Sequence, residues 1–309
     1  MKILVTGGAG FIGSHLVEAL IENGHTVGVL DNLSAGRLSH LHPDARFYEG
    51  DIKDHDFDKS FGRFAPNIVF HLAAQVDVQT SLKRPAFDAD VNITGTLRVL
   101  EACKEYGLAK LVYASSAAVY GYPEFLPVSE EHRIQPLSFY GISKHTPEHY
   151  IRTFSELYGL DYTVLRYANV YGERQDAHGE GGVVSIFTNR LLKGETPVIY
   201  GDGEQTRDFI YVKDVVAANL ATLQRGGKGI YNVSGNRRTS VNALLRLMCD
   251  ISGTPFAPEY REARTGDIVH SCLDNARAKR DLDWEPMVSL VDGLKATIDY
   301  VRDLQAKTL

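Results

Sequence analysis

A tyrosine and a lysine four residues apart are the strongest catalytic candidates in the chain: Tyr140 and Lys144 lie in the segment Tyr-Gly-Ile-Ser-Lys. On a helix, this spacing places both side chains on one face, one turn apart. A free phenol has a pKa near ~10 and is a poor base at neutral pH. An ammonium about 4 Å away contributes roughly 4 kcal/mol at an effective dielectric constant of ~20, or roughly three pKa units. The pair therefore predicts a tyrosine base.

Hydroxyl groups precede this pair in the segment Ser-Ser-Ala-Ala-Val-Tyr-Gly, which begins at Ser115 and includes Ser116. The segment follows a predicted strand at 110–115. A surface Tyr–Lys pair that does no chemistry is the alternative interpretation. The nearby hydroxyls favour a catalytic site, in which one serine binds the oxygen that loses its proton.

A glycine-rich segment near the amino terminus reads Thr-Gly-Gly-Ala-Gly-Phe-Ile-Gly and runs from Thr6 to Gly13. Glycines in such a turn bend the chain tightly, let the backbone approach a pyrophosphate and let a helix pack on a strand. The helix that follows offers free N–H groups and partial positive charge to an anion. A turn without a ligand is the alternative, but the flanking strand and helix favour a dinucleotide site.

Asp31 ends the second predicted strand, 18 residues after Gly13 (31 − 13). A carboxylate at this position accepts hydrogen bonds from both ribose hydroxyls and repels a 2′-phosphate. The next residues, Asn-Leu-Ser, include no arginine. The expected cofactor is therefore NAD rather than NADP, although an aspartate that only caps a loop is the alternative.

The elements that must position these residues alternate between strands and helices in the first half of the chain. Helical patterns lie between the strands, notably at 14–23, 87–106 and 139–158. This rhythm predicts an α/β protein with a Rossmann-type, doubly wound parallel sheet. Its strands are expected at 2–6, 26–30, 46–49, 67–71, 110–115, 161–165 and 209–212.

The second half is less regular, with a predicted loop at 172–182 and helices at 185–193, 240–252 and 289–304. Ser240 is the expected N-cap of the middle helix. We expect a smaller C-terminal α/β substrate domain that grows from insertions after the sheet. The expected division assigns residues 1–170 and a returning segment at about 205–235 to the NAD-binding Rossmann domain. Residues 171–204 and 236–309 then form the substrate-binding domain.

Composition excludes several classes of function. Of 309 residues, 44% are apolar and 23% are charged, and 33 basic against 39 acidic residues give a net charge of −6. Nucleic acids and anionic membranes need a basic face, so neither is an expected partner.

No apolar run is long enough to cross a membrane, and no signal peptide is apparent. No zinc-binding motif appears, so we expect no metal. Three widely spaced cysteines fit reduced thiols, and we expect a cytoplasmic protein.

Taken together, the motifs resemble the extended short-chain dehydrogenase/reductase family and, within it, the UDP-sugar 4-epimerases. The resemblance covers essentially the whole chain. Besides the segments above, it rests on Gly-Asp-Ile at 50–52, His-Leu-Ala-Ala at 71–74, Leu-Arg-Tyr-Ala-Asn-Val-Tyr-Gly at 165–172, Arg-Asp at 207–208 and Arg-Thr-Gly-Asp at 264–267.

The resemblance implies roles for individual residues. Tyr140 is the base, Lys144 also binds the nicotinamide ribose, and Ser116 binds the 4-oxygen of the sugar, with Ser115 as the competitor for that role. The implied NAD site consists of Gly7, Gly10, Phe11, Ile12, Gly13, Asp31, Asn32, Ser34, Ala35, Gly36, Asp51, Ile52, Leu72, Ala73, Ala74, Gln75, Asn92, Ser115, Tyr140, Lys144 and Ala168. The implied substrate site consists of Ser116, Tyr140, Asn169, Val183, Val184, Val198, Tyr200, Arg207, Arg264, Asp267 and Ser271.

The implied reaction inverts C4 of UDP-glucose and UDP-galactose through a transient 4-keto sugar, with the hydride held by bound NAD in between. A UDP-glucuronate 4-epimerase uses the same triad and remains the main alternative. Dehydratases and decarboxylases of the family carry ionisable residues near the hydroxyl residue, where this chain has Ala117, Ala118 and Val119. A dehydrogenase that releases NADH and a non-catalytic dinucleotide sensor are further alternatives.

Two further expectations follow from the resemblance. At the position of Ser271 the family often carries a bulky tyrosine that narrows the sugar pocket. A serine leaves more room, so the site is also expected to accept UDP-GlcNAc and UDP-GalNAc. The outer faces of the helices at 87–106 and 139–158 are expected to form a homodimer contact.

Overall fold

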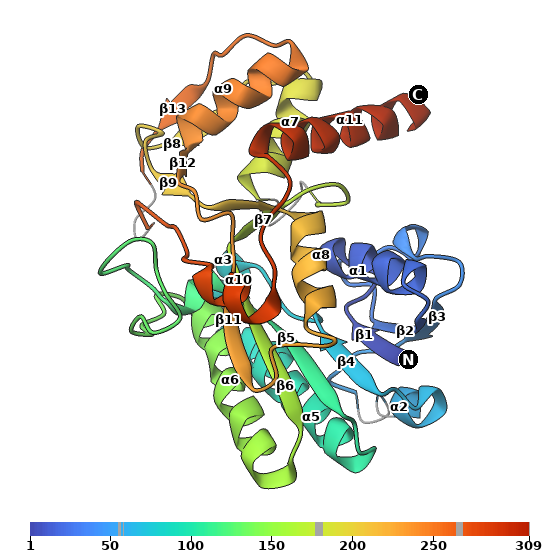
Figure 1. Cartoon of the computed structure of the whole chain (residues 1–309). Helices are drawn as coiled ribbons and strands as arrows, with labels where there is room; N and C mark the ends of the chain where they lie inside the picture. Colours follow the sequence, from blue (N-terminus) through green and yellow to red (C-terminus); the bar gives the residue numbers. More distant parts are fainter. Residues whose placement is uncertain (55–56, 58, 177–181, 264–267, 309) are drawn as a thin grey trace.

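A parallel sheet of seven strands, in the order β3-β2-β1-β4-β5-β6-β11, forms the centre of the molecule. The computed structural model, shown in Figure 1, describes residues 1–54, 57, 59–176, 182–263 and 268–308. The strands of the sheet are β1 (Lys2–Thr6), β2 (Thr26–Asp31), β3 (Arg46–Glu49), β4 (Ile68–His71), β5 (Lys110–Ser116), β6 (Asp161–Tyr167) and β11 (Gly229–Val233). The strand order reverses beside β1, and open α/β sheets bind their ligands at such a reversal.

Helices cover both faces of this sheet, which explains why its central strands β1 and β4 are nearly continuous apolar runs. On one face, apolar residues of the sheet pack against α1 (Phe11–Glu22), α8 (Val212–Ala221) and α10 (Ala276–Leu282). On the other face, they pack against α2 (Lys59–Phe64), α5 (Gly95–Glu105) and α6 (Phe139–Tyr158). The central strand β1 pairs in parallel with β2 on one side and with β4 on the other.

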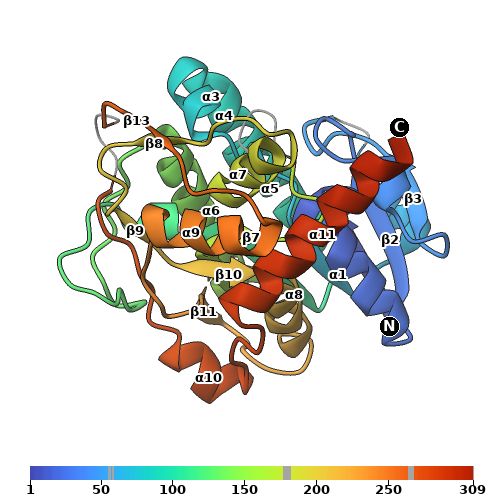
Figure 2. The ribbon, with the colours of Figure 1, turned by 90° about the horizontal axis from the view of Figure 1, so that it is seen from above.

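A second apolar core lies among α7 (Val183–Leu192), α9 (Val241–Ser252) and α11 (Leu290–Thr308). Phe11 and Ile12 of α1 pack against this core, so the unit lies over the amino terminus of α1. Figure 1 shows it above the sheet, and Figure 2 shows it from above. Its short strand pairs are β7 (Asn169–Tyr171) with β10 (Phe209–Tyr211), β8 (Val198–Tyr200) with β13 (Glu259–Arg261), and β9 (Thr206–Arg207) with β12 (Thr239–Ser240).

Short helical segments connect these elements: η1 (Leu38–His40), α3 (Val78–Lys83), α4 (Pro85–Ala89), the π-helical turn η2 (Asp90–Thr94) and η3 (Ala117–Val119). Among the described residues, no helix combines the length and apolarity that crossing a membrane requires.

The structure confirms the expected fold class. Strand β3 and helix α6 have the predicted bounds, and the Ser240 hydroxyl caps α9 by accepting from the backbone N–H of Ala243 at 3.2 Å. Helix α1 begins three residues earlier than predicted. The helix expected at 87–106 is instead α4, η2 and α5 in sequence.

One strand assignment was wrong. Residues 209–212 were expected in the main sheet, but Phe209–Tyr211 form β10, which pairs in parallel with β7. The seventh strand of the main sheet is β11, which pairs with β6. The reason lies in the partner strands: β7, which follows β6 after one residue, is outside the main sheet and pairs with β10, whereas β6 itself pairs with β11.

Candidate active site

The glycine-rich turn brings the backbone of α1 into direct contact with the end of β1. Gly7 has a φ of +71°, and a Cβ at this position would lie 2.7 Å from the backbone nitrogen of Ala73. A Cβ at Gly13 would lie 2.1 Å from the Gly7 carbonyl oxygen. Helix α1 has no acidic residue in its first turn, and its N-cap, Gly10, has no side chain. The free N–H groups and positive end of α1 therefore suit an anionic pyrophosphate.

Asp31 connects this turn to the end of β2. Its carboxylate accepts hydrogen bonds from the backbone N–H of Ala9 at 2.9 Å and of Leu33 at 2.8 Å. Burial raises the pKa of Asp31, and these two N–H groups oppose the rise. Each carboxylate oxygen keeps a lone pair that can accept a ribose hydroxyl. A Cβ at Gly36 would lie 3.0 Å from Asp31 Oδ1, so Gly36 lies against this carboxylate, while the backbone N–H of Ser34 donates to Asn32 Oδ1 at 3.0 Å.

The neighbouring predicted residues also lie at the carboxyl edge of the sheet. Asn32 donates to Asp51 Oδ2 at 2.9 Å, which joins the ends of β2 and β3. Ile52 is buried in the core under α5, and its side chain meets Gly95. Ala168 donates its backbone N–H to the Val233 carbonyl at 3.0 Å, between β6 and β11.

A buried histidine, not singled out for a functional role, fixes the wall formed by Leu72, Ala73 and Ala74. His71 Nδ1 lies 2.7 Å from Thr6 Oγ1, and His71 Nε2 lies 3.0 Å from Thr96 Oγ1. The Thr6 hydroxyl oxygen also accepts from the backbone N–H of Ala73 at 3.3 Å. Burial lowers the pKa of His71 to about 3, with Lys144 adding to the effect. The wall is therefore held by a neutral imidazole.

Gln75 and Asn92 form a polar network beside this wall. The Asn92 amide accepts from the backbone N–H of Gln75 at 2.8 Å and donates to Ser143 Oγ at 2.9 Å on α6. Both amides donate to Asp88 Oδ1, at 2.7 Å from Gln75 and 3.3 Å from Asn92. Asp88 is fully buried, and its Oδ2 has no hydrogen-bond partner among the described residues. These contacts tie α4 and η2 to α6.

The first turn of α6 lies against the turn that follows Ser116. Ser116 ends β5, and its hydroxyl accepts from the backbone N–H of Ala118 at 3.2 Å. Ser138 caps α6 by accepting from the Gly141 N–H at 3.1 Å. A Cβ at Gly141 would lie 2.5 Å from the Ala118 carbonyl oxygen. This close backbone approach brings Tyr140, the neighbour of Gly141, to the turn that carries Ser116.

Lys144 follows Tyr140 after one helical turn and is only 4% exposed, whereas Tyr140 is half-buried. The Nζ atom of Lys144 lies 4.7 Å from the centre of the Tyr113 ring. Burial lowers the pKa of Lys144 to about 8, and the carboxylates of Glu148 and Asp88 oppose this effect. The arrangement places an ammonium on the same helix face as a phenol, as the spacing predicts.

Glu148 and Arg166 are two charged residues beside the proposed site that the sequence analysis did not select as functional candidates. Glu148 accepts from Ser115 Oγ at 2.6 Å and forms a buried ion pair with Arg166 at 3.0 and 2.5 Å. A signal was present, because Glu148 continues the four-residue spacing from Tyr140 and Lys144. The sequence alone does not reveal that this carboxylate is buried.

The expected substrate residues are spread over the second unit. Asn169 begins β7 and is exposed, and its backbone N–H donates to the Asp208 carbonyl at 2.9 Å. Arg207 lies on β9 and donates to the Thr206 carbonyl at 3.0 Å. Val183 and Val184 begin α7, with Val184 buried in the core, and Val198 and Tyr200 are half-buried ends of β8. Arg264 and Asp267 lie outside the described residues.

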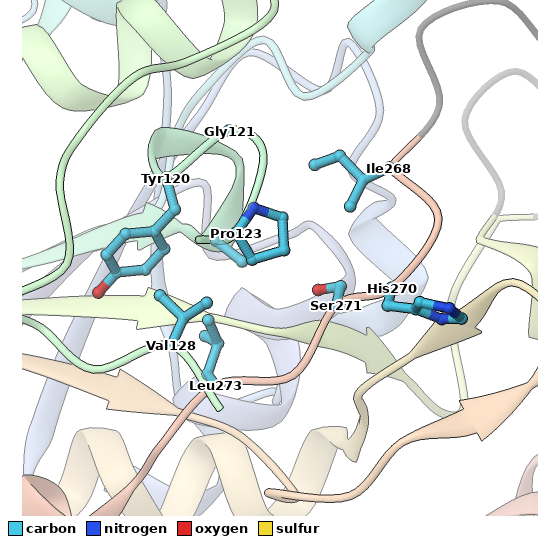
Figure 3. Close-up of a pocket in the computed structure, with 9 residues that line it drawn as sticks. Tyr120, Gly121, Pro123, Val128, Ile268, His270, Ser271 and Leu273 are labelled. Carbon is cyan, nitrogen blue, oxygen red and sulfur yellow. The ribbon is translucent and has the colours of Figure 1, made fainter. Parts of the chain in front are cut away.

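Ser271 lies across a pocket from the turn that follows Ser116. The pocket is lined on one side by Ala117 and Tyr120 and on the other by Ile268 and Ser271. Figure 3 shows the Ser271 hydroxyl pointing toward this space. Within the described part of the chain, no group of three or more His, Cys, Asp or Glu side chains is arranged to hold a metal ion.

Comparisons with known proteins agree with this geometry. A putative UDP-glucose 4-epimerase from Methanocaldococcus jannaschii is 45% identical over 97% of this chain and 98% of its own. The crystal structure of a UDP-glucose 4-epimerase from Thermotoga maritima with UDP-glucose has a TM-score of 0.97 at 48% identity, covering 99% of this chain and 100% of its own. A Thermus thermophilus UDP-glucose 4-epimerase in complex with NAD has a TM-score of 0.92 at 40% identity, covering 98% and 99%.

Relatives with other substrates also match. A UDP-N-acetylglucosamine 4-epimerase from Methanobrevibacter ruminantium has a TM-score of 0.94 at 36% identity, covering 98% of each chain. A UDP-glucuronate 4-epimerase from Thermodesulfobacterium geofontis is 36% identical over 97% of this chain and 96% of its own. The model of the NAD dependent epimerase/dehydratase family matches residues 3–234. With three quarters of its length matched and relatives aligned end to end, the chain belongs to the NAD dependent epimerase/dehydratase family.

Proposed function

We propose that the chain is an NAD-dependent UDP-sugar 4-epimerase that interconverts UDP-glucose and UDP-galactose. The observation that carries this proposal is the contact between the first turn of α6 and the turn after Ser116. Tyr140 and Lys144 lie in the first two turns of α6 and Ser116 ends β5, so this contact supports a shared site at one edge of the sheet. The relative solved with UDP-glucose, at 48% identity over nearly the full length, supports the choice of substrate.

Each of the three residues has one role in the proposed reaction. Tyr140 takes the proton from the 4-hydroxyl of the sugar and later returns a proton to the 4-oxygen. Lys144 stabilises the phenolate, because an ammonium one turn away favours the charged form of a phenol. Ser116 donates a hydrogen bond to the 4-oxygen. NAD, when bound, supplies the acceptor for the C4 hydride and the source from which it returns.

The residues at the sheet edge fit this cofactor. The amino terminus of α1 suits its pyrophosphate, and Asp31 suits its adenosine ribose. Gln75, Asn92 and Ala168 complete the proposed NAD site, together with the other residues inferred from the family resemblance. The cofactor stays in place during turnover, since the same hydride must return to the sugar.

Anchoring of the UDP group is the second requirement, because the 4-keto sugar must rotate without leaving. We assign this anchoring to Asn169 and Arg207, together with Arg264 and Asp267. A guanidinium forms bidentate hydrogen bonds with phosphate oxygens. The residue division that separates an NAD-binding part from a nucleotide-sugar-binding part belongs to the same proposal.

UDP-GlcNAc and UDP-GalNAc form a second candidate substrate pair. Ser271 is a small side chain that lines the pocket beside the Ser116 turn, which leaves room for an N-acetyl group. A dehydratase is disfavoured, because Ala117–Val119 form η3 without an ionisable side chain. A UDP-glucuronate 4-epimerase uses the same three residues and is distinguished by assay.

A homodimer and a role in galactose metabolism complete the proposal. The outer face of α6 exposes Ile142, Tyr150 and Leu157, with exposed fractions of 45%, 41% and 67%. An apolar stripe of this kind on a surface helix favours packing against a second copy. The three cysteines are buried and unpaired, which fits the reducing cytoplasm that we propose as its location.

The test is incubation of the purified protein with UDP-glucose, UDP-GlcNAc and UDP-glucuronate separately, without added NAD. We expect the C4 epimer of UDP-glucose to form and no NADH to be released. Replacement of Tyr140 by Phe is expected to lower kcat at least about a hundredfold, because it removes the base. Net release of NADH, or full activity of Tyr140→Phe, would refute the proposal.

A further inference from the structure

A buried ion pair joins α6 to β6, one helical turn beyond Lys144. Arg166 on β6 donates from Nε to Glu148 Oε1 at 3.0 Å and from Nη2 to Glu148 Oε2 at 2.5 Å. Both side chains are less than a tenth exposed. The same carboxylate accepts from Ser115 Oγ at 2.6 Å and lies 3.2 Å from His145 Nδ1. Glu148 is therefore held by β5, β6 and its own helix at once.

The position of Glu148 on α6 relates it to the reaction. It follows Lys144 by four residues and Tyr140 by eight, so the three side chains line one face over two turns. Ser115, which it binds, directly precedes Ser116 at the end of β5. The carboxylate thus contacts the residue before Ser116 on β5 and lies one helical turn from Lys144 on α6.

The ionisation of Glu148 is fixed by its partners. Hydrogen bonds from His145, Arg166 and Ser115 lower the pKa of this carboxyl to about 2, against the effect of burial. The guanidinium is held in turn, because Arg166 Nη1 donates to the Tyr120 hydroxyl at 3.0 Å and that hydroxyl donates to Asn232 Oδ1 at 2.7 Å. These contacts favour the charged form of Glu148 at neutral pH.

Charged and titratable groups approach Lys144 from several elements: Tyr140 and Glu148 on α6, Asp88 on α4, His71 on β4 and Tyr113 on β5. His71 is neutral, since burial lowers its pKa to about 3. Burial also raises the pKa of Tyr113 well above its ordinary value, so this phenol is neutral too. Among these described groups, burial lowers the pKa of Lys144, and the carboxylates of Glu148 and Asp88 raise it.

We propose that Glu148 is a positioning residue of the epimerase reaction, which keeps the buried Lys144 ammonium protonated and holds the Ser115 hydroxyl beside Ser116. The inference rests on the proposed function. Lys144 stabilises the Tyr140 phenolate only while it is charged, and a buried ammonium without a nearby carboxylate loses its proton more easily. Glu148 acts through Lys144 and Ser115 and does not itself touch the sugar.

The test is Glu148→Gln, which keeps the shape of the side chain and removes its charge. We expect the alkaline limb of the pH profile of kcat to move about one pH unit lower. The reason is that Lys144 loses its proton more easily without the carboxylate one helical turn away. On the alkaline side of that limb, such a shift lowers kcat about tenfold relative to the parent, and we expect the KM for UDP-glucose to stay unchanged within about twofold. Glu148→Asp retains the charge and should keep the alkaline limb of the parent enzyme, while the contact with Ser115 is lost.

A direct readout does not depend on turnover. The ultraviolet absorbance of tyrosinate, measured against Tyr140→Phe, follows ionisation of Tyr140 in the NAD-bound protein. In Glu148→Gln this titration is expected to move to higher pH. If the parent protein fails to epimerise any sugar, the proposed function fails, and the absorbance still shows whether Glu148 acts on the Tyr–Lys pair.

Two controls separate positioning from stability. Glu156→Gln changes an exposed carboxylate on the same helix and is expected to leave both titrations unchanged. If Glu148→Gln does not fold, because Arg166 is left unpaired in the interior, Glu148→Gln combined with Arg166→Met removes both charges. A folded variant that loses only thermal stability, with the kcat limb and the tyrosinate titration unmoved, overturns the proposal. So does an alkaline limb in Glu148→Asp that matches Glu148→Gln.

Discussion

Replacement of Gly141 by alanine tests whether a backbone contact sets the catalytic geometry. The added Cβ would lie 2.5 Å from the Ala118 carbonyl oxygen and 2.9 Å from Pro136 Cβ. A carbon and a carbonyl oxygen need about 3.3 Å, so α6 and the Ser116 turn must separate by about 0.8 Å. Neither obstacle is the flexible end of a side chain, and the strain therefore falls on the backbone that carries Tyr140 and Ser116.

The expected result is a loss of rate with little loss of stability. A misplacement of about 1 Å costs on the order of a hundredfold in rate, so kcat should fall about 10- to 100-fold. This corresponds to roughly 1.4–2.7 kcal/mol in activation free energy. Alanine favours a helix over glycine by about 1 kcal/mol, which offsets part of the packing strain. The Ser138 cap is retained, because it uses the backbone N–H of residue 141.

The assay is the initial rate of UDP-galactose conversion at saturating substrate, alongside the midpoint of urea unfolding. Gly62→Ala is the matched control, because Gly62 also lies in a helix and its added Cβ meets only the end of the Tyr106 side chain, at 3.2 Å. We expect this control to retain the parent kcat. An unchanged kcat in Gly141→Ala would show that the contact between α6 and the Ser116 turn does not set the position of the base.

Three further predictions concern pH, anchoring and specificity. The pKa of folded His71 lies below that of the unfolded chain, so the stability it contributes above its ordinary pKa of 6.5 is lost as the pH falls toward 3. Near pH ~5 we expect the free energy of unfolding to drop by about 2 kcal/mol, measured with urea, and this loss should be absent in His71→Gln. Arg207→Gln should raise the KM for UDP-glucose about 10- to 100-fold at nearly constant kcat, because it removes the charge-assisted hydrogen bonds that we assign between Arg207 and the UDP group. Ser271→Tyr should lower kcat/KM for UDP-GalNAc at least about tenfold relative to UDP-galactose, and equal effects on both sugars would contradict the assigned position of this side chain.

Local features of the sequence predicted the parts of the fold that depend on local chemistry. Strand β1 is buried on both faces and reads as a continuous apolar run, which is the pattern of a central parallel strand. Helix α6 begins after a serine cap and ends at Gly159, whose φ of +75° suits a glycine C-cap. The glycine-rich turn was recognisable because its steric requirements act over a few neighbouring residues.

Strand β11 escaped prediction because its sequence, Gly-Ile-Tyr-Asn-Val, is a weak strand pattern, whereas β10 is the apolar run Phe-Ile-Tyr. The places of the two strands are set by their partners: β11 pairs with β6, and β10 pairs with β7. The pairing of β6 with β11 joins residues that are more than sixty positions apart in the sequence, such as Thr163 and its partner Gly229. A local pattern carries no information on which of two candidate strands reaches the open edge.

The electrostatics of the catalytic pair show a deeper limit of sequence reasoning. The spacing of Tyr140 and Lys144 predicted a phenol whose pKa is lowered by a neighbouring ammonium, and that estimate assumes that the ammonium keeps its proton. In the folded chain Lys144 is buried, and its own pKa falls to about 8. The acidity of the phenol therefore depends on the groups that raise the pKa of Lys144 against the effect of burial, namely Glu148 on the same helix and Asp88 on α4. The motif marks the proposed reacting groups, while the charge state that their proposed roles require depends on side chains from several elements, which only the fold brings together.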